Sequence, residues 1–210
     1  MMKKIYLFIA ALGLIAGTVN AQNDPKAKKM LDAVSEKLKE YNGVNANFTL
    51  VSKTRSGKIN NNGSGKISIK GNKYYIKQGA TEIFNDGTKT WNYNGNNEVT
   101  VSLTEDADNA LSPQMLLTNF YDRDFTYKLV SSAGKYNEIQ MLPKDRRKNF
   151  QKINLFVDKA KMMVTKAIVL DKSNNATVLN LTNINTAANI PENTFVFDKK
   201  KYKQNIEVIE

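Results

Sequence analysis

The stretch FNDGTKTWNYNGNNEVTVS, residues 84–102, shows the pattern from which the fold can be predicted. Asp86-Gly87 and Asn94-Gly95 are dipeptides typical of two-residue hairpin turns, in which both central residues need a positive φ. Between these turns, Trp91 and Tyr93 alternate with polar residues. Because side chains alternate across a strand, the stretch predicts short antiparallel strands with one aromatic face. Either an ordinary core or a ligand must cover that face.

The same period of two continues on both sides of this stretch. Apolar residues alternate with polar ones at Phe48 and Leu50, Ile67 and Ile69, Tyr74 and Ile76, and Val99 and Val101, and the pattern returns after residue 124 up to a last strand expected at Thr194–Phe197. Asn- and Gly-rich turns separate these segments. About ten or eleven strands without intervening long helices predict one antiparallel sheet, and sheets of that size tend to curl.

Two segments show helical periodicity instead. Asp24-Pro25 is a typical helix start, and Leu31, Val34 and Leu38 then recur on one face until Asn42-Gly43. A shorter helix is expected over 112–120. It begins at Ser112-Pro113, and Met115, Leu116 and Phe120 share one side. Each helix is amphipathic and needs an apolar surface to cover.

The N-terminus has the features of an export signal. Lys3 and Lys4 precede the apolar run 5–17, and Val19-Asn20-Ala21 is a small-residue cleavage site. We therefore expect a signal peptide at 1–21, cleaved after Ala21, and a single domain at 22–210. The chain has no Cys, so it can form no disulfide and carry no lipid on an N-terminal cysteine. A periplasmic location is expected.

The residues needed for common catalytic chemistry are missing. With no His and no Cys, the chain lacks the commonest general base, a thiol nucleophile and the commonest metal ligands. The acidic run 105–109 lacks the glycine of a calcium loop. We expect no enzyme, no cofactor and no metal site.

The net charge of +11 has two possible meanings. The lysines can simply keep a β-rich protein soluble, or they can attract it to an anionic membrane surface. The charge is spread thinly, so nucleic acid is not expected as a partner. The same ambiguity applies to the run Lys199–Lys203, which fits a charged edge strand, a frayed end or a binding patch.

The order of these segments resembles the family of periplasmic outer-membrane lipoprotein carriers, LolA. The likeness rests on the amphipathic helix, Phe48-Thr49, the strand opened by Gly65, the run from Asn85 to Asn94, and the Ser-Pro-x-Met-Leu-Leu segment. One feature departs from the family: its early strand ends in an arginine-proline pair whose arginine helps to latch the lid, whereas this strand ends Lys70-Gly71-Asn72.

The resemblance implies an unclosed antiparallel β-barrel, a half-barrel covered by the N-terminal helix and by the inserted helix as a lid. It also implies a hydrophobic cavity that holds the acyl chains of lipoproteins. We expect Phe48, Leu50, Ile67, Ile69, Trp91 and Tyr93 to line the concave side, with Leu31, Val34, Leu38, Met115, Leu116 and Phe120 on the lid helices.

The function implied is that of a monomeric carrier. Its partners would be acylated lipoproteins, an inner-membrane exporter, and an outer-membrane receptor or the outer membrane itself. A second possibility is a periplasmic sensor of the same fold that detects lipids or binds a membrane-anchored partner protein. The residues alone also allow a filled core with no cavity.

Overall fold

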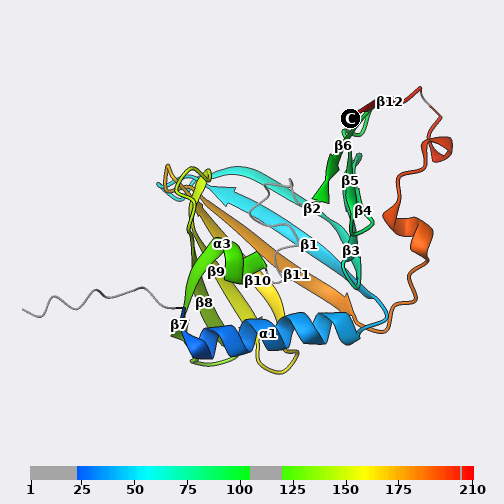
Figure 1. The fold of residues 1–210 in the computed structure, drawn as a ribbon. Coiled ribbons are helices and arrows are strands. Elements are labelled where there is room, and N and C mark those ends of the chain that lie inside the picture. The colour runs from blue at the N-terminus through cyan, green and yellow to red at the C-terminus, as the bar shows by residue number, and fades with distance from the viewer. Residues whose placement is uncertain (1–22, 105–119, 204) are drawn as a thin grey trace, which may run out of the picture.

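The structure is a computed structural model that describes residues 23–104, 120–203 and 205–210. It is a single large curved sheet with one long helix across it (Figure 1). In the described ranges, no helix is both long and apolar enough to cross a membrane.

The long helix α1 spans Pro25–Glu40 and confirms the prediction made from its start signals and apolar stripe. Asp24 is the N-cap, and its Oδ1 accepts a hydrogen bond from the Lys26 amide at 2.8 Å. Pro25 fits the first turn because its missing amide hydrogen would have no partner within the helix. Asp24 also anchors the helix to the sheet, since its Oδ2 accepts from the Leu129 amide at 3.0 Å.

Within the described residues, the sheet contains 12 strands, in the order β12-β6-β5-β4-β3-β2-β1-β11-β10-β9-β8-β7. The strands are β1 (Val44–Lys53), β2 (Ile59–Lys70), β3 (Lys73–Gln78), β4 (Thr81–Asn85), β5 (Lys89–Tyr93), β6 (Glu98–Leu103), β7 (Phe125–Ser131), β8 (Tyr136–Pro143), β9 (Phe150–Asp158), β10 (Met163–Asp171), β11 (Ala176–Asn185) and β12 (Glu207–Ile209). Every neighbouring pair is antiparallel except β12 with β6, which is parallel.

The sheet consists of two meanders joined in its middle. Strands β1–β6 form one meander and β7–β11 the other, and β1 pairs with β11 to connect them. The edges β7 and β12 do not pair with each other, so the barrel stays open. This confirms the predicted half-barrel that is mainly β, with α1 lying across the side formed by β7–β11 (Figure 1).

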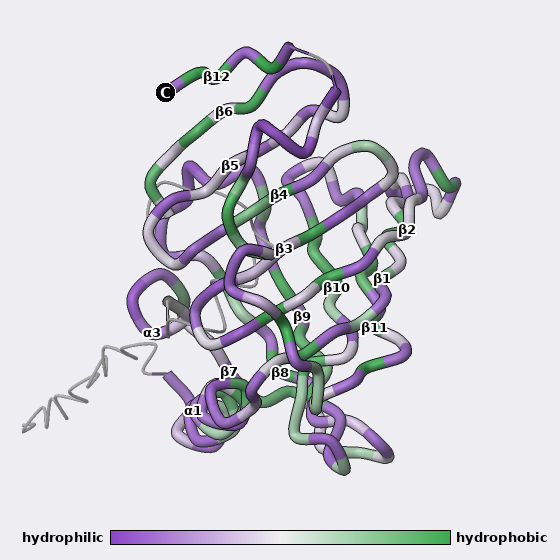
Figure 2. Tube along the Cα trace, turned by 90° about the vertical axis from the view of Figure 1, so that its right-hand side faces the viewer, coloured by the Kyte–Doolittle hydropathy of each residue, from purple (hydrophilic) through white to green (hydrophobic). Residues whose placement is uncertain are grey.

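The main core lies between α1 and the face of the sheet turned toward it, which we call the inner face. Leu31 and Val34 of α1 are fully buried against it, together with Ile139, Leu155 and Val157 of the second meander. Figure 2 shows the apolar stretches gathered along β1, β9 and β10. Burial of this surface is the main favourable contribution to folding.

The two turns of the opening stretch differ from the expected type. Residues 86–88 and 94–97 connect the strands, so the loops contain more than two residues. Only Gly87 and Gly95 have positive φ there, at 95° and 86°. The Asp86 carboxylate explains the longer first loop, because its Oδ1 accepts from the amides of Thr88 and Lys89, each at 2.8 Å, and so stabilises a wider turn.

The C-terminal segment also differs from the prediction. The strand expected at Thr194–Phe197 is wrong, since Glu192–Phe195 forms a 3₁₀ helix, η2. A second such turn, η3, covers Lys199–Lys201. From residue 186 onward the chain runs along the face of β3–β6 that points away from α1 (Figure 1). We call that side of the sheet the outer face.

Candidate functional site

The inner face brings together four of the residues predicted to line a cavity. Phe48 and Leu50 of β1 lie opposite Gly65 and Gly63 of β2, and Ile67 and Ile69 continue the same face of β2. Phe48 and Ile69 are 5% and 8% exposed, whereas Leu50 and Ile67 are only partly buried. The structure therefore places these four side chains on one surface.

Two glycines of β2 make room on this surface. A Cβ at Gly65 would lie 2.1 Å from the Lys77 carbonyl oxygen and 2.5 Å from Cζ of Phe48. The Phe48 ring therefore lies directly over the Gly65 backbone. The position opposite Leu50 is also a glycine, Gly63, so no side chain covers Leu50 from β2. At Gly63 the nearest side chain is that of Gln78, so Leu50 has no apolar neighbour from β2.

More apolar side chains of the inner face are incompletely covered. Ile76 and Ile83 follow Ile67 across the sheet in register, and Leu179 of β11 lies opposite Leu50. All are partly buried and contact the edge of the main core. The main core centres on α1 and β7–β10 and includes Val44, Ile69 and Tyr74 of β1–β3. The inner face of β1–β4 thus offers a continuous apolar surface that α1 does not fully cover.

The predicted lid residues of α1 have the expected orientation. Leu31 and Val34 are 0% exposed and Leu38 is 6% exposed, all in the main core. Residues 112–119 of the predicted helix, Met115 and Leu116 among them, lie outside the described residues. The described helix there is α3, Phe120–Asp124, which begins at the last residue of the predicted segment.

Trp91 and Tyr93 do not share the inner face, so this part of the prediction is wrong. Trp91 of β5 pairs with Phe84 of β4. Phe84 in turn pairs with Tyr75 of β3, and Tyr75 pairs with Ser68 of β2. Directly paired residues point to the same side of a sheet, and Ser68 points away from Ile67 and Ile69, which flank it in β2. Trp91 therefore points outward. The inner positions of β5 are occupied by polar Thr90 and Asn92.

The C-terminal segment explains why aromatic residues point outward here. Tyr93 and Val99 pack with Ile206, and Trp91, Phe197 and Tyr202 complete this cluster. Phe195 of η2 is 0% exposed and forms a neighbouring cluster with Ala188, Ile190 and Tyr75. The aromatic face of the opening stretch therefore belongs to a second, outer core supplied by the chain's own end.

A buried carboxylate fixes this outer core. Glu82, 9% exposed, accepts hydrogen bonds from the hydroxyls of Tyr75 and Tyr202, each at 3.0 Å, and from Lys77 Nζ at 2.6 Å. Burial, reinforced by the neighbouring Glu82 charge, raises the pKa of both tyrosines. Both hydroxyls therefore stay protonated and keep donating to Glu82.

Comparison with known proteins shows the family to which this chain belongs. The sequence model of the family described as outer membrane lipoprotein carrier protein LolA matches residues 17–197. The chain belongs to the LolA family. No curated protein sequence is similar enough to count as a match.

Several solved structures are similar to this LolA-family protein at low sequence identity. An uncharacterized conserved protein from Thermus thermophilus is 13% identical, with a TM-score of 0.58, over 88% of this chain and 98% of its own. A LolA superfamily protein from Nitrosomonas europaea is 13% identical, with a TM-score of 0.49, over 81% and 97%. A putative outer membrane lipoprotein-sorting protein domain from Vibrio parahaemolyticus is 13% identical, with a TM-score of 0.49, over 83% of this chain and 98% of its own. At 13% identity, the likeness to the Thermus thermophilus structure concerns the fold alone.

Lys70 ends the strand that carries the lid-latching arginine in the family resemblance. Its Nζ lies 2.8 Å from Glu192 Oε1 and 3.2 Å from the Ile190 carbonyl oxygen. Lys73 contacts the same carboxylate at 2.7 Å. In this LolA-family member, the end of β2 is therefore bound to the C-terminal segment.

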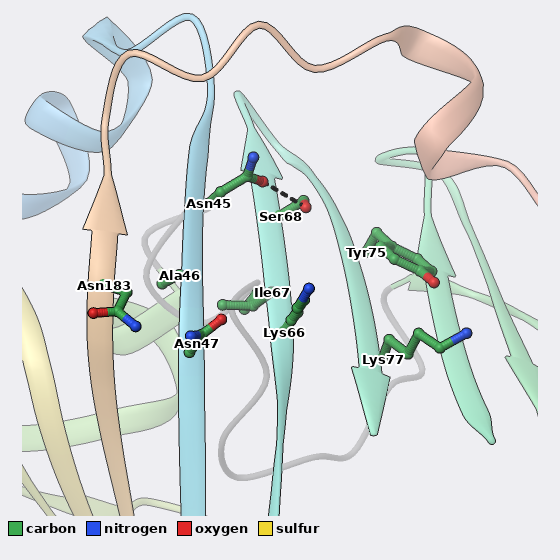
Figure 3. Close-up of a pocket in the computed structure, with 9 residues that line it drawn as sticks. All are labelled: Asn45, Ala46, Asn47, Lys66, Ile67, Ser68, Tyr75, Lys77 and Asn183. Carbon is green, nitrogen blue, oxygen red and sulfur yellow. Dashed lines mark hydrogen bonds between the residues drawn. The ribbon is translucent and has the colours of Figure 1, made fainter. Parts of the chain in front are cut away.

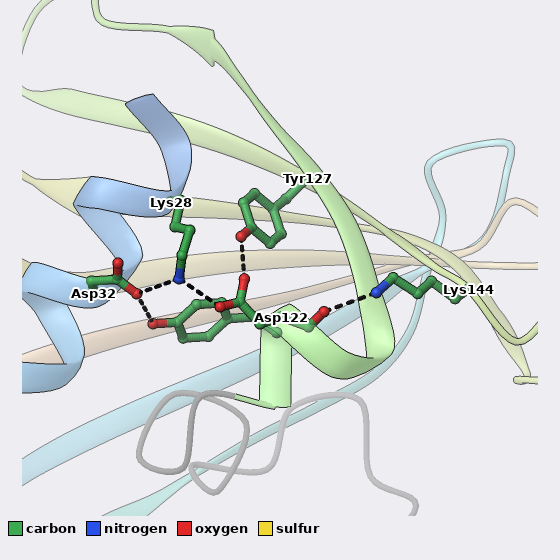
Figure 4. Close-up of polar contacts among 6 residues, drawn as sticks. Lys28, Asp32, Asp122, Tyr127 and Lys144 are labelled. Carbon is green, nitrogen blue, oxygen red and sulfur yellow. Dashed lines mark hydrogen bonds and ion pairs between the residues drawn. The ribbon is translucent and has the colours of Figure 1, made fainter. Parts of the chain in front are cut away.

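A polar cluster that sequence reasoning missed connects α1 with α3 instead. Lys28 Nζ lies 3.1 Å from Asp32 and 2.5 Å from Asp122 of α3. The Tyr121 hydroxyl donates to Asp32 at 2.8 Å, and the Tyr127 hydroxyl donates to Asp122 (Figure 4). Lys28 and Asp122 are 94 positions apart, so no local pattern could have paired them.

The ionisation states of this α1–α3 cluster support each other. Both aspartates raise the pKa of Lys28 through their hydrogen bonds. Burial opposes ionisation of Asp122, but hydrogen bonds from Lys28 and Tyr127 outweigh it and lower the pKa of that carboxyl. Burial and the Asp32 contact raise the pKa of Tyr121. The cluster is thus a charged connection, partly open to water, between the long helix and the end of the insert.

The acidic side chains of the described ranges are spread out. No group of three or more acidic side chains gathers there as potential metal ligands. Most described carboxylates in contacts bind lysine, arginine or backbone amides, as Asp158 does with Lys135 and the amides of Ala160 and Lys161.

Proposed function

We propose that this protein carries the acyl chains of lipoproteins across the periplasm, from an inner-membrane exporter to an outer-membrane receptor or to the outer membrane itself. One observation carries the proposal: the inner face of β1–β4 holds large apolar side chains that the protein's own helix leaves partly uncovered. Membership of a family described as lipoprotein carriers supports the same role.

The surface has the chemistry that an acyl chain requires. Leu50, Ile67, Ile76 and Ile83 offer only hydrocarbon. Ile67, Ile76 and Ile83 lie side by side on β2, β3 and β4, and Leu50 shares their face further along β1. Each methylene removed from water contributes roughly 0.8 kcal/mol. A long acyl chain could therefore gain on the order of 10 kcal/mol, enough to leave a membrane surface without covalent chemistry.

Carrying needs a surface that can be uncovered and covered again. The helix α1 stays packed in the main core through Leu31 and Val34, and the partly exposed Lys28–Asp122 ion pair connects it to α3. Ion pairs open to water contribute little, typically ~1 kcal/mol or less. Contacts of this strength can break and re-form as cargo enters and leaves.

The carrier hypothesis can be tested by photo-crosslinking from two adjacent positions of β1. Leu50 points to the inner face, whereas Thr49 is exposed on the opposite side. A photoreactive phenylalanine analogue at position 50 should crosslink to acylated lipoproteins in cells, and the same analogue at 49 should not. Equal crosslinking from both positions would contradict an inner-face cargo site.

Depletion of the protein provides the second test. Outer-membrane lipoproteins should then accumulate at the inner membrane. Correct lipoprotein placement after depletion, with position 50 crosslinked to a membrane-anchored signalling protein, would replace the carrier by a sensor of the same fold.

A further inference from the structure

A groove lined by polar and apolar groups lies on the outer face, on the other side of the sheet from Leu50. It has a volume of about 300 Å³ and is lined by Asn45, Ala46, Asn47, Lys66, Ile67, Ser68, Tyr75, Lys77 and Asn183. Figure 3 shows that these residues come from four neighbouring strands, β11, β1, β2 and β3. Lys66, Ser68, Tyr75 and Lys77 occupy alternate positions on the outer face of β2 and β3.

The groove has an uncompensated positive charge. Lys66 lies directly opposite Lys77 in the β2–β3 ladder, and like charges in that arrangement destabilise a sheet. Glu82 neutralises Lys77 at 2.6 Å. Among the described residues, no hydrogen bond or ion pair is made by Lys66 Nζ. The arrangement therefore has room for one further negative charge.

A backbone distortion brings an amide into this groove. The register of β1 with β11 shifts between Asn45 and Asn47, so β11 contains an extra residue at this point. Asn183 sits in the irregularity with φ of +50°, a conformation that non-glycine residues seldom adopt. Strained backbone of this kind often marks functional positions. Here it lies where the Asn183 side chain borders the groove, beside Asn47 (Figure 3).

We infer that this groove binds a singly charged phosphodiester flanked by hydroxyl groups, the chemistry of a glycerophosphodiester. Lys66 supplies the unpaired cation. The amides of Asn47 and Asn183 can both donate to and accept from hydroxyls, which an acyl chain could not use. The volume is at the lower end for ligand sites and suits a molecule of headgroup size.

The inference is independent of the carrier function, because the groove lies on the other side of the sheet from Leu50. Glycerophosphodiesters have two sources, free molecules and the headgroups of anionic phospholipids. Both present the same group to Lys66, so the experiment needs one arm for each source.

The soluble arm is a titration with glycerophosphoglycerol, followed by NMR shifts of the Asn side-chain amides. Lys66→Gln should weaken binding roughly tenfold, since a charge-assisted contact is lost. Lys58→Gln is the matched control, because it removes the same charge from an exposed lysine outside the groove and should leave binding unchanged. Asn183→Gly separates binding from folding: it removes the amide but suits the left-handed backbone, so binding should fall while stability is kept or raised.

The membrane arm measures flotation with phosphatidylglycerol vesicles and with phosphatidylcholine vesicles. Lys66-dependent binding to phosphatidylglycerol vesicles, without binding of the free probe, would identify the lipid headgroup as the source. Equal losses in Lys66→Gln and Lys58→Gln would reduce the effect to general charge attraction and overturn the inference. Absence of binding in both arms, or full binding by both Lys66→Gln and Asn183→Gly, would overturn it too. Acyl-chain loading in the same variants should stay normal, so failure here leaves the carrier hypothesis untouched.

Discussion

Leucine-to-alanine substitutions at two positions of the inner face can distinguish a cargo surface from a structural core. Leu155 of β9 is 1% exposed and lies in the main core, whereas Leu50 of β1 is partly buried beside the glycines of β2. Leu→Ala removes the same atoms at both positions. The two variants therefore differ only in what surrounds the deleted side chain.

The expected losses follow from burial. Leu155→Ala leaves a cavity in a packed core and should lower the free energy of unfolding by about 3–5 kcal/mol. For the carbons deleted at Leu50, complete burial would contribute roughly 2–2.5 kcal/mol of stability, but only part of this is gained because the side chain is partly exposed to water. Leu50→Ala should therefore cost about 1 kcal/mol of stability. The unrealised part, again about 1 kcal/mol, is gained only when an acyl chain covers the surface, so loading should weaken about fivefold.

Urea unfolding gives the first quantity, and displacement of a fluorescent fatty-acid probe gives the second. Leu155→Ala, studied where it is still folded, should bind the probe normally. If Leu50→Ala lost as much stability as Leu155→Ala and bound the probe unchanged, Leu50 would be an ordinary core residue. The inner face of β1–β4 would then have to be regarded as filled.

Three further predictions address other parts of the fold. The fluorescence emission of Trp91 should stay constant when an acyl probe binds, because Trp91 is in the outer core. Phe197→Ala should shift this emission to the red. A shift of the wild-type emission on probe binding would place the ligand on the outer face. Gly65→Ala should destabilise the protein clearly, since the new Cβ meets the Lys77 carbonyl at 2.1 Å, and thermal unfolding should show a much smaller change for Ser64→Ala on the exposed side. Hydrogen bonds from Lys70 and then Lys73 lower the pKa of Glu192 from 4.5 to about 2, so its stabilising contribution is present above pH 4.5 and lost as pH falls toward 2. Glu192→Gln should therefore flatten the dependence of stability on pH in that interval. An unchanged dependence would mean that the two lysines do not bind this carboxylate in solution.

The parts predicted correctly from the sequence depend on local patterns. The start of α1 needs only a cap and a proline, and its buried face needs only the spacing of Leu31, Val34 and Leu38. The meander needs only alternation and turns. Four residues of the proposed cargo surface were found because they lie on strands next to one another in the chain, where a shared face follows from short connections.

The errors concern faces and distant partners. Alternation shows that Trp91 and Tyr93 share a side but not which side, because one side becomes apolar only when residues more than 90 positions later fold against it. The sequence of β5 is equally compatible with both orientations. The α1–α3 cluster was missed for a related reason, since Lys28 and Asp122 look like ordinary surface charges until the sheet brings the two helices together.

The pairing of β1 with β11 has a consequence for how the chain reaches its native state. Asn45 must find Asn185, and Ser52 must find Thr177 across a separation of 125 residues. Each meander can form from local hairpins, but their junction must close a very long loop, and such contacts form slowly. Until then both β1 and β11 present unpaired edges, which favour association with other chains. Because β1 is synthesised far ahead of β11, the chain first exists as two open half-sheets. The period before β1 meets β11 is when it is most exposed to proteases and to its own copies.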